Sequence, residues 1–187
     1  MTVTRALRHC GVRGALAGGL LLAGAMPLAA QWSAAPSVAV GLGVPGGALH
    51  DAVGEGVTAK AGLWIRAPRV PVGFTAEVMY THLRGDRGRP VADDLQIGSV
   101  LANITTRRHE GRLDPYGTAG IGWYGFTDPD NRFTSRRAPG VNVGVGEVIA
   151  VGRRDLFVEA RLHAMRTSTP TGSTWTTFLP LMLGVRF

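Results

Sequence analysis

The sequence predicts an all-β protein, an eight-stranded antiparallel up-and-down transmembrane β-barrel preceded by a cleavable signal peptide. Three observations support this prediction. The chain opens with an export signal, eight later segments alternate between apolar and other residues at period two, and nearly all charged residues of these segments avoid the apolar face. A soluble β-sandwich shows the opposite distribution, because its interior is apolar and its charged side chains face water.

The first thirty residues form the predicted signal peptide. They contain three arginines and no acidic residue, then an apolar run from Gly14 to Met26, and they end on small residues at Ala30. We expect cleavage before Gln31, which leaves residues 31–187 as one barrel domain. The alternative is a membrane-anchoring helix, but the apolar run is shorter than the roughly 20 residues that a spanning helix needs.

Charge and cysteine content exclude several classes of function. The chain has 20 basic and 13 acidic residues, and loss of residues 1–30 leaves 17 basic residues, a net charge of +4. The remaining arginines are scattered, so we expect no nucleic-acid partner. Cys10 is the only cysteine and lies in the signal, so neither a disulfide nor a lipid anchor is expected in the mature protein.

The first three predicted strands, at 37–44, 57–66 and 72–81, are apolar on one face only. Their charged residues all fall on the other face, which we take as the inner one: Lys60, Arg66 and Glu77. The outer faces of these strands therefore suit lipid, where an Arg or Lys at the midplane costs roughly 2 to 4 kcal/mol.

The fourth predicted strand, at 95–105, alternates weakly. We expect Val100, Ala102 and Ile104 to point outward, with a bulge earlier in the strand as a possible shift of register. The fifth, at 116–126, places Trp123 outward and glycines inward, which suits a narrow and strongly curved wall.

The sixth predicted strand, at 141–151, begins with outward valines, but Glu147 then falls on the same face, so we expect a bulge near Gly146. The seventh begins at Leu156 and turns Glu159, Arg161 and His163 inward. The closing strand follows a polar loop at 167–174. Its outer side carries Leu181, Leu183, Val185 and Phe187, and its inner side carries Arg186.

The predicted connections alternate in length. The odd ones are long and the even ones mostly short: 45–56, 83–94, 127–140 and 167–174 against 67–69, 108–115 and 152–155. Long loops on one side and short turns on the other are typical of bacterial barrels with both termini in the periplasm.

The whole chain resembles the small bacterial outer-membrane β-barrel domain family and is similar in architecture to OmpA-type and OmpX-type barrels. The resemblance rests on the signal, the eight strands, the segment PYGTAGIGWYGF, and the ending FVEARLHAMRT followed by FLPLMLGVRF. It implies an outer-membrane location and a closing strand, ending at Phe187, that the barrel-assembly machinery reads as a signal. It implies no single activity, because functions in this family are diverse.

The inward charged residues form a candidate lumenal polar network: Lys60, Arg66, Glu77, Glu159, Arg161, His163 and Arg186. Such a network is either a polar relay or gate, or a set of paired charges that fills a narrow lumen, and we favour the second. On the outer side, Tyr80, Trp123 and Trp175 lie at the loop ends of their strands and predict an aromatic girdle, with Phe187 at the opposite interface.

The predicted loops offer a second kind of candidate site. Their arginines either meet phosphates of lipopolysaccharide or are simply solvated: Arg84, Arg87, Arg89, Arg132, Arg136 and Arg137. The acidic segment from Asp128 to Asn131 lacks the rest of a calcium loop, so we expect no metal there.

Three functions remain open: a monomeric structural or surface-interaction barrel, which we favour, a narrow passive pore, and a lipid A-modifying enzyme. Glu159, His163 and Ser168 invite a hydrolase interpretation. However, outer-membrane deacylases place a serine two residues after an outward histidine, and here Met165 occupies that position and His163 is expected inward. We therefore expect neither catalytic residues nor a cofactor.

Overall fold

The computed structural model describes residues 32–67, 70–85, 94–107, 113–127, 137–169 and 172–187, and one compact unit runs from Ser33 to Phe187. Several sequence predictions lie outside the described residues. They are the signal peptide at 1–30, the acidic segment at 128–131, and the loop arginines Arg87, Arg89, Arg132 and Arg136.

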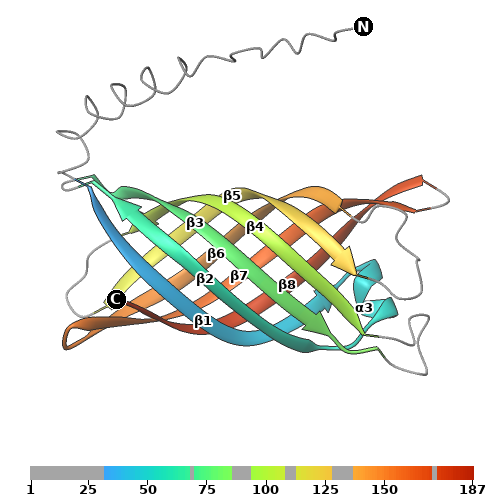
Figure 1. The fold of residues 1–187 in the computed structure, drawn as a ribbon, viewed down its shortest axis with the longest axis horizontal. Coiled ribbons are helices and arrows are strands. Elements are labelled where there is room, and N and C mark those ends of the chain that lie inside the picture. The colour runs from blue at the N-terminus through green and yellow to red at the C-terminus, as the bar shows by residue number, and fades with distance from the viewer. Residues whose placement is uncertain (1–31, 68–69, 86–93, 108–112, 128–136, 170–171) are drawn as a thin grey trace, which may run out of the picture. The chain divides into compact units, whose positions relative to one another are not determined.

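Eight antiparallel strands close into a barrel in simple sequence order, with β1 paired to β8 (Figure 1), so the predicted fold class is confirmed. The strands are β1 (Ser33–Gly46), β2 (Gly56–Arg66), β3 (Val72–Leu83), β4 (Leu95–Arg107), β5 (Leu113–Thr127), β6 (Arg137–Val151), β7 (Arg154–Thr169) and β8 (Gly172–Arg186). A short helix, α3 (Ala48–Ala52), lies between β1 and β2. Among the described residues, no helix is long and apolar enough to cross a membrane.

We call the end of the barrel that carries α3 the helix end and the end that carries the C-terminus the terminal end (Figure 1). At the helix end, β7 and β8 continue to Thr169 and from Gly172, so the predicted polar loop at 167–174 is wrong. Threonines explain the difference, because β-branched residues favour strands. Thr167 and Thr176 also share a hydrogen bond of 2.8 Å between their hydroxyl oxygens.

The outer wall of the barrel is apolar and exposed. Val40, Ile121 and Val145 expose about two thirds of their surface, at 65 %, 67 % and 67 %, whereas inward side chains of the same strands are 4 % exposed or less at Ala39, Tyr124 and Asn142. A monomeric soluble protein rarely exposes so large a continuous apolar surface. The wall therefore matches the lipid-facing belt of a membrane barrel.

The bulge suggested for β4 is wrong, and the weak alternation of this strand has another cause. The pairing of β4 with β3 and β5 runs without interruption, and Val100, Ala102 and Ile104 point outward as predicted. The pattern is weak because Leu95, Ile97 and Leu101 are buried inside the barrel, so β4 is apolar on both faces.

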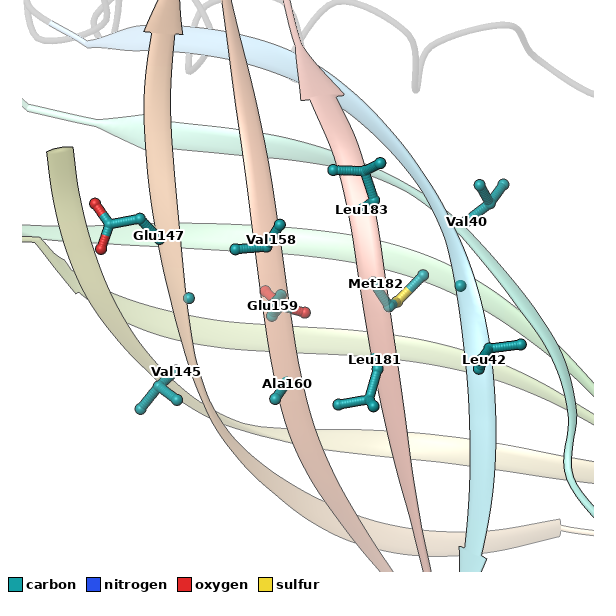
Figure 2. A pocket seen from close by; sticks show the side chains of 12 residues that line it. Val40, Leu42, Val145, Glu147, Val158, Glu159, Ala160, Leu181, Met182 and Leu183 are labelled. Carbon is teal, nitrogen blue, oxygen red and sulfur yellow. The ribbon is translucent and has the colours of Figure 1, made fainter. Parts of the chain in front are cut away.

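The predicted bulge near Gly146 in β6 is also wrong, since the ladder with β5 and β7 is continuous through this position. Gly146 is small for a packing reason, because an added Cβ would lie 2.3 Å from the ring of Tyr116. Glu147 therefore projects from the outer wall, as Figure 2 shows. Its Oε1 is shielded from solvent and has no hydrogen-bond partner among the described residues.

The interior is filled in layers, and the inner face of β7 shows their order. Phe157 belongs to an apolar cluster near the terminal end, Glu159 and Arg161 to a charged layer, and Met165 to a second apolar cluster near the helix end. His163 lies between the charged layer and Met165 along the strand. Leu49 of α3 and Val53 after it are buried in the second cluster, so the helix closes that mouth of the barrel.

Candidate functional site

Four charged side chains meet in the middle of the barrel: Lys60 of β2, Glu77 of β3, and Glu159 and Arg161 of β7. Lys60 Nζ lies 3.2 Å from Glu77 Oε1 and 2.6 Å from Glu159 Oε1. Arg161 pairs with both carboxylates, with Nη2 2.7 Å from Glu159 Oε2 and Nη1 bonded to Glu77. All four side chains are 2 % exposed or less. This central quartet carries two positive and two negative charges and is balanced within itself.

Glycines on the inner wall make room for the quartet. An added Cβ at Gly62 would lie 2.8 Å from Cγ of Glu77, and one at Gly144 would lie 2.9 Å from Cβ of Arg161. Both glycines pair across the ladder with the charged residue that they accommodate. The curved wall is therefore thin where the long charged side chains cross the lumen.

Two neutral residues add donors to the two carboxylates of the quartet. Asn103 Nδ2 donates to Glu77 Oε2 at 2.9 Å, and the Tyr116 hydroxyl donates to Glu159 Oε2 at 2.8 Å. The network predicted from the sequence contains neither Asn103 nor Tyr116, although both residues have inward parity. Each carboxylate oxygen of the quartet now has at least one donor. Such saturated groups suit a filled lumen better than a proton relay.

His163, which was predicted to join the network, has separate partners. Its ring is fully buried, its Nδ1 lies 2.8 Å from the Tyr124 hydroxyl, and it stacks on Phe178 at 4.7 Å between centroids. Glu159 lies four residues away on the same strand, a distance of about 13 Å. The histidine therefore belongs to the apolar side of the interior.

Arg66 and Arg186, the other two predicted members, lie at the terminal end. Arg186 pairs with Asp155, and its guanidinium lies 5.1 Å from the centre of the Trp64 ring. Together with Arg66, these residues line a pocket of about 250 Å³. The aromatic layer of Trp64, Tyr116 and Phe157 lies between the two arginines and the central quartet. The seven predicted residues thus form three separate groups.

The residues of the hydrolase interpretation do not assemble. Ser168 is exposed and His163 is buried inside the barrel, on the opposite face of the same strand. Glu159 is held by Lys60, Arg161 and Tyr116. In the part of the chain that the structure describes, no group of three or more His, Cys, Asp or Glu side chains is placed to hold a metal ion.

The aromatic residues of the predicted girdle all face outward and are about half exposed, between 47 % and 58 %: Tyr80, Trp123, Trp175 and Phe187. The first three lie toward the helix end and Phe187 at the terminal end. Leu181 and Leu183 are exposed on the same face of β8, with Val185 partly covered. The backbone N–H of Phe187 donates to the carbonyl oxygen of Pro36 at 2.9 Å, which ties the last residue to β1. Arg84 and Arg137, the loop arginines that the structure describes, are both exposed.

Comparisons with known proteins give a likeness of fold. No family model and no curated protein sequence matches the chain. Among solved structures, it is similar to Neisserial surface protein A (NspA), with a TM-score of 0.59 and 18 % identity over 83 % of this chain and 97 % of that one. A major outer membrane protein from Thermus thermophilus and the outer membrane enzyme PagL each give a TM-score of 0.50 and 15 % identity. Both cover 83 % of this chain, and the chain covers 100 % and 99 % of them. The chain thus has the fold of the small outer-membrane β-barrels.

Proposed function

We propose that the chain is an integral outer-membrane protein with an envelope or surface-interaction role, inserted after loss of residues 1–30. The exposed apolar wall supports insertion into lipid, and the likeness of fold to outer-membrane proteins supports the choice of membrane. The alternation of loops and turns supports a periplasmic location for both termini, with the helix end outside. The closing strand would then be recognised by the barrel-assembly machinery.

The observation that most favours an interaction role over conduction is the filled interior. The helix α3 and its apolar cluster occupy one mouth, the central quartet crosses the middle, and the aromatic layer lies beyond it. An eight-stranded barrel is only wide enough for its own side chains. The functional surfaces are therefore the outer wall and the loops.

Cell fractionation tests the location. We expect the mature chain, beginning at Gln31, in the outer-membrane fraction, extractable only with detergent and with heat-modifiable mobility on gels. Recovery of the chain in a soluble periplasmic fraction without detergent would contradict the proposal and favour a soluble binding barrel.

Planar-bilayer recording tests the alternative of a narrow pore. We expect no steady conductance above that of protein-free bilayers, because a continuous water path is blocked at three depths. The control for insertion is the heat-modifiable gel mobility of reconstituted protein from the same preparation. Reproducible single-channel steps would show that the lumen opens.

A lipid-modifying enzyme is the third alternative, and the similarity to the fold of PagL keeps it open. Mass analysis of lipid A from cells that produce the chain or its Ser168→Ala variant tests it. We expect the same lipid A masses in both and in cells without the chain. A mass change that requires Ser168 would identify an activity.

A further inference from the structure

A row of four side chains crosses four neighbouring strands on the outer wall near the helix end. Trp123 of β5 pairs with Pro139 of β6, and Arg166 of β7 pairs with Trp175 of β8. Pro139 and Arg166 are also neighbours, because Gly140 pairs with Met165 one step along the ladder. The order across the wall is therefore Trp, Pro, Arg, Trp, with a cation between aromatic rings. We call this row the Arg166 site.

Among the described residues, Arg166 has no acidic partner. Its Nη2 donates to the hydroxyl oxygen of Ser173 at 3.2 Å, and within the same parts of the chain it forms no ion pair with an Asp or Glu. Arg137 lies on the same face of β6, two residues before Pro139. In the described parts of β5 to β8, the outer face has a single acid, Glu147, and it lies toward the terminal end. The described residues of the site are thus locally positive and favour the binding of an anion.

An apolar groove of about 760 Å³ extends from the Arg166 site along the wall toward the middle of the belt. Small residues keep it open, with Ala76 and Ala102 on one side and Gly122 and Gly140 along its course. Val100, Ile121 and Val141 supply the rest of its apolar lining, and Arg166 is the only charged residue among the described ones that line it. The groove therefore has a cationic mouth and an uncharged body, which is the polarity of a lipid.

We infer that the Arg166 site binds a phosphate-bearing lipid of the leaflet around the helix end. The guanidinium pairs with the phosphate, the two tryptophans pack against the headgroup, and an acyl chain lies in the groove. This inference rests on the proposed membrane location. A second copy of the chain is a poorer occupant, because a symmetric dimer in one membrane brings equal depths together, and the described outer wall offers no acid at this depth.

Native mass spectrometry of the detergent-solubilised full mature barrel tests the inference, with diphosphorylated lipid A and the same lipid after removal of its phosphates as probes. We expect the wild type to retain the phosphorylated probe and Arg166→Gln to bind it at least tenfold more weakly, since a hydrogen bond to a charged group is worth about one to two powers of ten in affinity. Arg84→Gln, which removes an exposed arginine elsewhere at the helix end, should bind as the wild type does.

Three outcomes would overturn the inference. The first is equal binding of the phosphorylated probe by the wild type and Arg166→Gln, and the second is equal binding of the two probes by the wild type. The third is a dimer without bound lipid that the Arg166→Gln change disrupts. Heat-modifiable mobility shows whether each variant is folded. Trp123→Leu together with Trp175→Leu gives a second measurement that leaves the charge intact, and its loss of binding supports the site. Failure of the proposed function is distinguishable, because it appears as a soluble chain in fractionation whatever Arg166 does.

Discussion

Glu159 shows how this sequence makes a stable interior from charged residues. Its carboxylate is approached by Lys60 from β2, by Tyr116 from β5 and by Arg161 from its own strand. Each partner is buried, so each desolvated charge depends on the others. At the scale of single residues, the quartet is therefore one unit. Removal of one charged side chain leaves an opposite charge buried without its full set of partners.

Substitutions in the quartet should be strongly non-additive. We expect Lys60→Met or Glu159→Gln alone to lower the free energy of unfolding by about 3 to 5 kcal/mol where the site is dry, and the double variant to lose less than the sum of the two. Urea unfolding in detergent measures all three. Losses that simply add would mean that these charges do not interact.

Glu147 is the opposite case, a carboxylate on the apolar wall whose Oε1 lacks a partner among the described residues. We expect Glu147→Val to raise the free energy of unfolding by about 1 to 2 kcal/mol, because a lipid-facing carboxylate is a cost, though a smaller one than a lipid-facing arginine. Urea unfolding in lipid vesicles provides the measurement. Glu55→Val, at an exposed position between α3 and β2, is the matched control and should change little. A destabilised Glu147→Val barrel would reveal a partner for this carboxylate.

At the scale of elements, period-two alternation was sufficient to predict which face of each strand points out of the barrel. The alternation is interrupted where a strand is apolar on both faces, as at Ile97 and Leu101, or where a charge points outward, as at Glu147. In both places a bulge was inferred, although the strand is regular. The odd or even position of a residue in its strand indicates the face on which its side chain lies. The partner of an inward side chain depends instead on which strands oppose each other once the barrel closes.

The same limit explains the candidate network. Seven inward residues could be named from parity, but the division of His163, Arg66 and Arg186 from the central quartet depends on their depth along the axis. Asn103 and Tyr116 are neutral, so a search for charges passes over them. A search for every polar inward residue at the depth of Glu77 and Glu159 would have found both.

The closing strand β8 gives a prediction of its own. Deletion of Phe187 should impair assembly in cells far more than refolding in detergent, if the assembly machinery reads its terminal aromatic residue. Burial of a Phe side chain is worth roughly 1.5 to 3 kcal/mol, and Phe187 is half exposed, so the purely structural loss is modest. Heat-modifiable gel mobility of cellular and refolded protein compares the two.

Val151→Ala is the control for the Phe187 deletion, because it trims another exposed apolar side chain at the terminal end. It should leave both preparations folded. Normal assembly of the Phe187 deletion in cells would remove the case for a recognition role.

At the scale of the whole molecule, polarity is reversed relative to a soluble protein. The paired charges lie at the centre of the barrel, and exposed valines and leucines lie on its outer wall. In the proposed membrane location, lipid supplies the burial that the outer wall lacks, while the interior contacts form within the protein itself. This division explains why the barrel should survive in detergent, which replaces the lipid belt but leaves the interior contacts unchanged.

The position of α3 also sets the order in which the molecule can be completed. The apolar cluster that receives Leu49 and Val53 draws its members from six strands, β3 through β8, while the helix is attached to β1. A five-residue helix has almost no stability alone, so we expect α3 to form only after the strands that supply this cluster have come together. The Val53 amide, which donates to the carbonyl oxygen of Leu49 at 2.9 Å, therefore reports on assembly: we expect its protection from hydrogen exchange to begin only when the strands β3 through β8 have come together around the helix.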